Sequence, residues 1–157
     1  MTFQRHGVTF IDISPKLADK ENFKEIINEI TKGIPSDVDY IISPESRGYI
    51  FGPAVAYNLG IGFVPVRKPN KLPDDVVVTV SYEKEYGTDI LCLPKNDNYS
   101  GKTFYFVDDV LATGGTLEAV KKLVDKVDGN FAGAGVYINL VDLNNYDNVT
   151  SVEQIRF

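Results

Sequence analysis

The apolar positions along the chain alternate between a helical period and the short continuous runs that are typical of buried strands. One helix is predicted after Asp19, which can cap its first turn, and it ends at Gly33. Its apolar side chains fall on one face: Phe23, Ile26, Ile27 and Ile30. A second helix is predicted over about residues 49–59 and a third over residues 117–124.

Strands are predicted between these helices from short runs of β-branched and aromatic residues. They cover residues 40–42, 63–66, 102–107, 132–140 and 152–157. Residues 76–81 and 89–93 are predicted to pair as a hairpin around residues 82–88. Pro65 favours a sheet edge or a strand end, because it cannot donate a backbone hydrogen bond. The alternation of strands and helices predicts an α/β fold with an open, mainly parallel twisted sheet, flanking helices and a site at the carboxyl ends of the strands.

Length and charge narrow the class of protein. At 157 residues, of which 43% are apolar and 24% charged, we expect a single globular domain over residues 1–157. The net charge of −6 argues against non-specific binding to nucleic acid or a membrane, so local basic residues have to meet any phosphate. Cys92 is the single cysteine, which excludes an intrachain disulfide. The polar N-terminus and the lack of a long apolar run favour a cytoplasmic location.

The residues after the strand at 102–107 carry the strongest chemical signal. Asp108 and Asp109 stand where the strand ends. A loop of small residues then leads into the next helix: Ala112, Thr113, Gly114, Gly115 and Thr116. Glycines let the backbone approach a ligand, free N–H groups and the helix dipole favour an anion, and hydroxyls add donors. Since carboxylates accept hydrogen bonds from sugar hydroxyls, the run predicts a cradle for a ribose 5-phosphate.

Simpler interpretations of this run exist. A pair of glycines before a helix can be only a turn, and a pair of aspartates can be a magnesium site or a solvated loop. No lysine follows the glycines, so this is not a Walker loop, and the G-x-G-x-x-G dinucleotide pattern is absent. The combined order of strand, paired acids, small-residue loop and helix favours the phosphate site.

The same run resembles the phosphoribosyl-pyrophosphate (PRPP) signature of the type I phosphoribosyltransferases. Three further segments resemble adenine phosphoribosyltransferases, at residues 43–52, 62–73 and 82–89, and the resemblance extends from about residue 7 to 142. It implies that family's fold, with a small hood formed by about residues 1–15 and the C-terminal segment. It also implies a homodimer, Mg²⁺ held mainly by PRPP and water, and purine salvage: phosphoribosyl transfer from PRPP to adenine, giving AMP and pyrophosphate.

The resemblance assigns roles to individual residues. Asp108 and Asp109 would bind the ribose 2′- and 3′-hydroxyls, and their charges would stabilise positive charge on the sugar ring. Residues 112–116 would bind the 5′-phosphate. Two segments would form the pyrophosphate site: Glu45, Ser46, Arg47, Arg67, Lys68 and Lys71. Type I enzymes often place a non-proline cis peptide in this loop, which we expect between Glu45 and Ser46.

Two further elements complete the site that the resemblance implies. Residues 82–88 would form a lid over PRPP, because water would otherwise intercept the activated sugar. Glu85 would manage the proton on the imidazole ring of the purine, and Tyr86 would shield the ribose. The hood would bind the base, with backbone groups available to read a purine edge, through three residues: Thr9, Phe10 and Ile11.

Two segments depart from the family pattern. The family usually has an arginine where Ile11 stands, and a glycine–arginine segment where this chain has residues 144–148. We expect both departures to lie in or near the hood and away from the PRPP machinery. The alternatives to an adenine enzyme are a 6-oxopurine phosphoribosyltransferase and a non-catalytic PRPP or purine sensor on the same fold. Adenine is favoured because residues 139–142 include no lysine for a 6-oxo group, and catalysis because the lid acid and basic loop are present.

Overall fold

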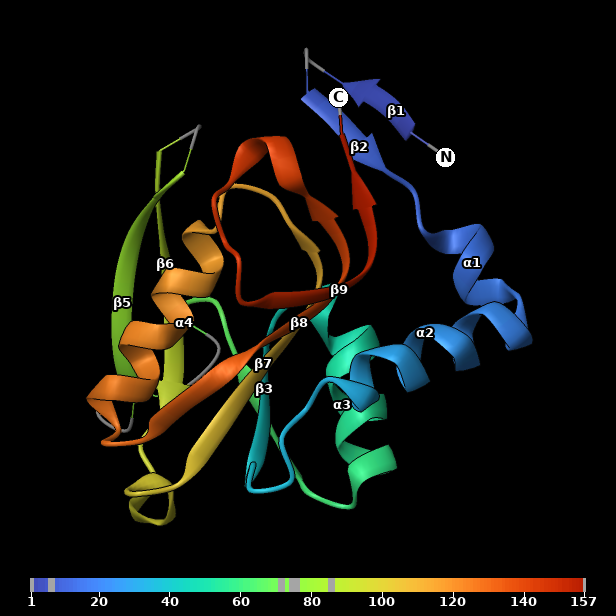
Figure 1. Ribbon diagram of the computed structural model, residues 1–157. Helices are drawn as coiled ribbons and strands as arrows, with labels where there is room; N and C mark the ends of the chain where they lie inside the picture. The colour runs from blue at the N-terminus through green and yellow to red at the C-terminus, as the bar shows by residue number, and fades with distance from the viewer. Residues whose placement is uncertain (1, 6–7, 71–72, 74–76, 85–86, 157) are drawn as a thin grey trace.

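A five-stranded sheet forms the centre of the molecule in the computed structural model, which describes residues 2–5, 8–70, 73, 77–84 and 87–156 (Figure 1). The strand order is β4-β3-β7-β8-β9, and every neighbouring pair is parallel. The strands are β3 (Tyr40–Pro44), β4 (Gly62–Val66), β7 (Thr103–Leu111), β8 (Asn130–Leu140) and β9 (Val149–Ile155). The predicted open, mainly parallel α/β sheet is confirmed, and Pro65 lies in an edge strand as expected.

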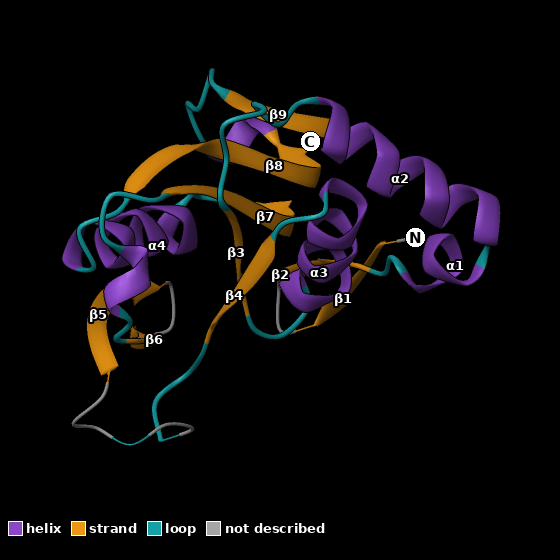
Figure 2. Ribbon diagram, turned by 90° about the horizontal axis from the view of Figure 1, so that it is seen from below, coloured by secondary structure: helices purple, strands orange, loops and turns teal. Residues whose placement is uncertain are grey.

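Helices cover both faces of this sheet (Figure 2). The short α1 (Ser14–Ala18) leads into α2 (Lys20–Lys32), which lies with α3 (Gly48–Leu59) on one face, while α4 (Gly115–Lys126) lies on the other. Asp19 caps α2 as predicted, accepting hydrogen bonds from two backbone N–H groups of its first turn. Alternate side chains of β7 enter the two cores: Phe104 and Phe106 face α4, and Tyr105 and Val107 face α2 and α3. No helix in the described part of the chain is long and apolar enough to cross a membrane.

The predicted hairpin is also present, outside the central sheet. Its strands β5 (Val77–Lys84) and β6 (Gly87–Pro94) pair antiparallel. Two backbone hydrogen bonds join Arg67, just after β4, to Cys92 of β6, at 2.9 and 2.7 Å. These bonds fasten the hairpin, near its open end, to the carboxyl end of the sheet.

The two segments that we expected to form the hood lie in different sheets. Strands β1 (Thr2–Arg5) and β2 (Val8–Ile11) form a separate antiparallel pair near the N-terminus (Figure 1). The C-terminal segment, which we expected in the hood, instead forms β9 and extends the central sheet beside β8. The reason is packing: Val149 contacts the core under α4, while Val152 and Ile155 contact the core under α2 and α3.

The chain order creates a crevice at the carboxyl end of the sheet. From β3 the chain passes through α3 to β4, which lies on one side of β3. The next strand of the central sheet along the chain is β7, and it lies on the other side of β3. The loops after β3 and β7 therefore leave the sheet on opposite sides. A crevice at such a topological switch point is where open α/β sheets bind ligands.

Candidate active site

A pocket of about 200 Å³ opens at this switch point. It brings together residues that the sequence assigned to three roles: Glu45, Ser46, Arg47, Lys68, Asp108, Asp109 and Thr116. Tyr82, from β5, forms part of the wall on the hairpin side. The segments after β3, β4 and β7 thus meet as predicted.

The paired carboxylates lie within β7, which continues past the predicted end to Leu111, and they are almost fully buried, with Asp108 9% and Asp109 7% exposed. The backbone N–H of Asp109 donates to Oδ1 of Asp108 over 2.8 Å. Burial, and next the charge of Asp109, raises the pKa of Asp108 well above its ordinary value. Gly48 gives Asp108 the room it occupies, because a Cβ there would lie 3.0 Å from Asp108 Oδ1.

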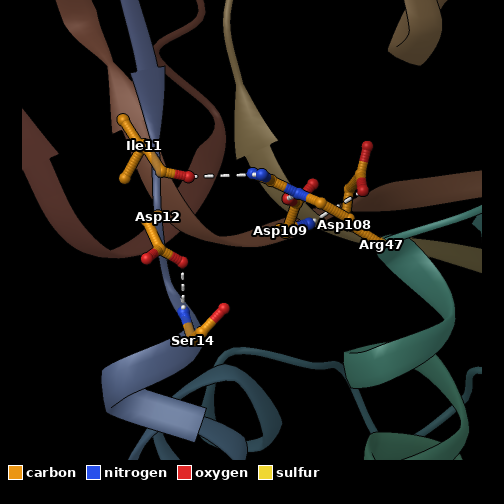
Figure 3. A network of polar contacts seen from close by, with 6 residues as sticks. All are labelled: Ile11, Asp12, Ser14, Arg47, Asp108 and Asp109. Carbon is orange, nitrogen blue, oxygen red and sulfur yellow. Dashed lines mark hydrogen bonds and ion pairs between the residues drawn. The ribbon is translucent and has the colours of Figure 1, made fainter. Parts of the chain in front are cut away.

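Arg47 connects three parts of the site (Figure 3). Its Nε donates to Oδ2 of Asp109 in a close ion pair, and its Nη1 donates to the carbonyl oxygen of Ile11 over 3.2 Å. Since Arg47 precedes α3 and Ile11 ends β2, the guanidinium joins the loop after β3 to both the paired acids and the hood. Next to Ile11, hydrogen bonds from Ser14 lower the pKa of Asp12.

The loop after β3 is held by its own glutamate. The peptide bond between Glu45 and Ser46 is cis, as the resemblance implied. Glu45 Oε1 accepts a 2.5 Å hydrogen bond from the backbone N–H of Lys68 and lies 3.7 Å from Nε of Arg67. Tyr49 donates to the carbonyl oxygen of Val66 over 2.6 Å, and burial raises its pKa to about 12. Glu45 and Tyr49 therefore fix the position of the basic segment that follows β4.

The basic segment after β4 brings Lys68, but not Arg67, into the lining of the pocket. Lys68 Nζ lies 2.9 Å from Oδ2 of Asp89 in β6. Arg67 Nε is buried and has no hydrogen-bond partner within the described part of the chain. Lys71, Glu85 and Tyr86, which the sequence assigned to the pyrophosphate site and the lid, lie outside the described residues.

The small-residue loop leads directly into α4. Gly114, the residue before the helix, has φ +94°, a conformation that favours glycine. A Cβ at Gly115 would lie 3.6 Å from the ring of Tyr82 and 3.7 Å from the carbonyl oxygen of Glu83. The end of the β5 strand therefore lies against this loop, where a lid would have to be.

Of the two departures from the family pattern, Ile11 lies at the end of β2 as expected, whereas residues 144–146 lie against the small-residue loop, which we did not expect. Ile11 contacts Arg47 through its carbonyl group. Asn144 donates to the carbonyl oxygen of Ala112 over 2.9 Å, and a Cβ on Gly114 would lie 2.3 Å from the Tyr146 ring. No strand order was predicted from the sequence, and it is the pairing of β7 with β8 that brings the residues after these two strands together.

Known proteins have sequences similar to this chain. A family model described as "Phosphoribosyl transferase domain" matches residues 15–141. The adenine phosphoribosyltransferase of Streptococcus thermophilus is 46% identical over 143 residues, which cover 90% of this chain and 83% of that protein. The chain belongs to the adenine phosphoribosyltransferase family. The suspected family is thereby confirmed, and the chain is an enzyme of this family.

Solved structures of adenine phosphoribosyltransferases agree with the assignment. The enzyme from Thermoanaerobacter pseudethanolicus superposes with a TM-score of 0.85 at 38% identity, covering 95% of this chain and 90% of the other. The enzyme from Saccharomyces cerevisiae, solved in complex with an imino-altritol bisphosphate and adenine, superposes with a TM-score of 0.82 at 34% identity. That match covers 91% of this chain and 85% of the yeast chain. The predicted fold class is confirmed.

Proposed function

We propose that this adenine phosphoribosyltransferase family member transfers the phosphoribosyl group of PRPP to adenine, giving AMP and pyrophosphate in purine salvage. One observation carries the proposal: a single pocket combines the paired carboxylates, Thr116 in the first turn of α4 and the cations of Arg47 and Lys68. PRPP presents a matching set of groups, namely ribose hydroxyls, a monophosphate and a pyrophosphate. The yeast relative, solved with adenine bound, supports adenine as the base.

The residues bind PRPP in three places. The 5′-phosphate accepts hydrogen bonds from the loop at residues 112–116, where the N-terminus of α4 favours an anion. The ribose hydroxyls donate to Asp108 and Asp109. The pyrophosphate lies against the loop after β3 and the basic segment after β4: Glu45, Ser46, Arg47, Arg67, Lys68 and Lys71.

This arrangement suits the charges that develop during the reaction. As the bond from ribose C1 to pyrophosphate breaks, positive charge appears on the sugar and negative charge on the leaving group. In this proposal the buried Asp109, 7% exposed, lies near the positive charge on the sugar. Arg47 and Lys68 lie near the negative charge on the leaving pyrophosphate. Such fixed charges stabilise a transition state strongly, because little reorganisation is needed when the charge develops.

The base enters between the sugar and the hood. Adenine presents an amino donor beside a ring acceptor, and the backbone of Thr9, Phe10 and Ile11 supplies both kinds of partner. Ile11 is tied to the pyrophosphate side by its carbonyl contact with Arg47. Glu85 manages the proton on the imidazole ring of adenine, and Tyr86 shields the ribose from water.

The carboxylates of the pocket, Asp108 and Asp109, fit a Mg²⁺ ion that is held mainly by PRPP and water. Within the described residues, no three His, Cys, Asp or Glu side chains gather into a metal-binding group. Two adjacent carboxylates line the pocket, and one of them already pairs with Arg47. Mg²⁺ commonly keeps several waters and substrate phosphates as ligands, and when bound it neutralises charge on the pyrophosphate.

Assembly and location complete the proposal. Family membership supports a homodimer, which sedimentation velocity tests directly. A cytoplasmic location and a single domain over residues 1–157 follow the sequence expectations above. Nucleic acid and membranes are not partners in this proposal.

Steady-state kinetics with PRPP, Mg²⁺ and a panel of purines tests the function. We expect the highest kcat/KM with adenine, and one pyrophosphate released for each AMP formed. A higher kcat/KM with hypoxanthine, guanine or xanthine would overturn adenine, and binding of PRPP without turnover would indicate a sensor. Asp108→Asn combined with Asp109→Asn should lower kcat by about 10²–10³-fold. The exposed Asp125→Asn, in α4, is the matched control and should retain full activity.

A further inference from the structure

Residues 144–146, which we call the strap, follow β8 and the short turn Val141–Leu143 and contact the phosphate loop. The side-chain Nδ2 of Asn144 donates to the carbonyl oxygen of Ala112 over 2.9 Å. The same group contacts Oδ1 of Asn139 at 2.9 Å and the carbonyl oxygen of Leu140 at 3.1 Å. Its Oδ1 accepts from the backbone N–H of Tyr146 over 3.1 Å. The amide of Asn144 is therefore held at both ends, beside the buried Asn139.

The contact at Ala112 constrains the loop that follows. In a trans peptide the C=O and N–H groups point in opposite directions. Fixing the Ala112 carbonyl on the strap thus turns the Thr113 N–H away from the strap. That N–H belongs to the loop, so Asn144 fixes the direction of a group proposed to bind phosphate.

Tyr146 holds the next part of the loop. A Cβ on Gly114 would lie 2.3 Å from the Tyr146 ring, so the ring lies directly on the glycine before α4. The Tyr146 hydroxyl donates to Oε1 of Glu118 over 2.5 Å, and burial, with Glu118, raises the pKa of Tyr146 to about 12. Tyr146 therefore stays a neutral donor at physiological pH. Glu118, an acid in the first turn of α4, also has Lys121 Nζ at 3.7 Å.

Together these contacts reach the start of the loop, its central glycine and the first turn of the helix. We propose that Asn144 and Tyr146 are positioning residues, which hold the phosphate loop in the conformation that binds the 5′-phosphate of PRPP and AMP. The inference rests on the proposed function of the loop. It assigns a task to a segment in which this chain departs from the family pattern.

The test compares ligands with and without the 5′-phosphate. Asn144→Asp keeps the side-chain shape but replaces the donor to Ala112 with an acceptor, and Tyr146→Phe keeps the ring but removes the bond to Glu118. We expect Asn144→Asp to weaken AMP binding about tenfold and Tyr146→Phe about threefold, measured by calorimetry. Adenosine, which lacks the phosphate, should bind both variants within about twofold of the parent affinity, as judged by competition. The exposed Asn145→Ala is the control and should change neither affinity.

Kinetics supply a second readout. The KM for PRPP should rise in both variants, whereas the KM for adenine should stay constant. Equal weakening of AMP and adenosine, or no weakening of either, would overturn the positioning role. If Asn144→Asp fails to fold, the milder Tyr146→Phe decides by the same comparison. If the parent enzyme binds no AMP, the proposed function itself fails, and the inference fails with it.

Discussion

Replacing Arg47 with methionine removes a cation from the pocket but retains a long side chain. The variant loses the ion pair to Asp109 and the 3.2 Å hydrogen bond from Nη1 to the Ile11 carbonyl oxygen. A hydrogen bond to a charged group contributes about 1.5–3 kcal/mol to stability. Because 45% of the Arg47 side chain is exposed, water replaces part of both interactions. We therefore expect the free energy of unfolding to fall by about 2 kcal/mol.

Urea unfolding, monitored by circular dichroism, measures this loss. The change corresponds to a decrease in Tm of about 4–8 °C for a chain of this size. Lys32→Met is the matched control, since Lys32 pairs with Glu29 over 2.8 Å but 72% of its side chain is exposed. An exposed pair of this kind contributes little to stability, because water screens it.

A double-mutant cycle with Asp109→Asn isolates the pair itself. We expect a coupling energy of about 1–2 kcal/mol between Arg47 and Asp109, because Asp109 is buried beside a second carboxylate. If Arg47→Met costs no more than Lys32→Met, the ion pair contributes nothing to the fold, and the reasoning above is refuted.

Three further predictions concern packing, pH and proton transfer. Gly52→Ala should lower the free energy of unfolding by about 1–3 kcal/mol, because the new Cβ would lie 2.1 Å from Ser43 Oγ. That hydroxyl donates a hydrogen bond to the carbonyl oxygen of Val107. An unchanged or higher midpoint of urea unfolding would contradict this prediction. The pKa of Asp108 is raised in the folded protein. The contribution of Asp108 to the free energy of unfolding is therefore fully present below its ordinary pKa of 3.8, and it is lost as the pH rises through the raised pKa. Asp108→Asn should therefore gain stability relative to the parent between about pH 4 and pH 7, and parallel pH profiles would refute the shift. Glu85→Gln should lower kcat by about 10²–10⁴-fold with PRPP affinity unchanged, and full turnover would remove Glu85 from the mechanism.

Most of the fold could be predicted because its elements carry strong local signals. Residues 104–107 of β7 are apolar on both faces, as a strand covered by helices on both sides must be. The face of α2 follows directly from the spacing of its three buried isoleucines. The C-terminal strand was predicted over residues 152–157, but its pairing with β8 was not, because a half-exposed edge strand has a weaker pattern and its partner is chosen by tertiary packing.

The candidate site could be predicted where its residues follow one another in a single segment of the chain. Acids at a strand end followed by glycines at a helix start mark a phosphate site within one continuous segment, as Asp108 and Gly114 do. The contacts of Asn144 and Tyr146 join segments about 30 residues apart, so they depend on the order of the strands. Neither residue type in isolation indicates a role beside a phosphate.

The ion pairs of the pocket explain how an acidic chain can hold a polyanion. Arg47 and Lys68 each contact a carboxylate on another element, Asp109 on β7 and Asp89 on β6. Unpaired cations gathered in one pocket would repel one another, and buried acids without cations would tend to take up protons. Guanidinium and ammonium groups have several N–H donors, so a cation that binds a carboxylate can still donate to a pyrophosphate. In the proposed function, Asp109, which suits a positively charged sugar, would therefore also position Arg47, which suits the leaving group.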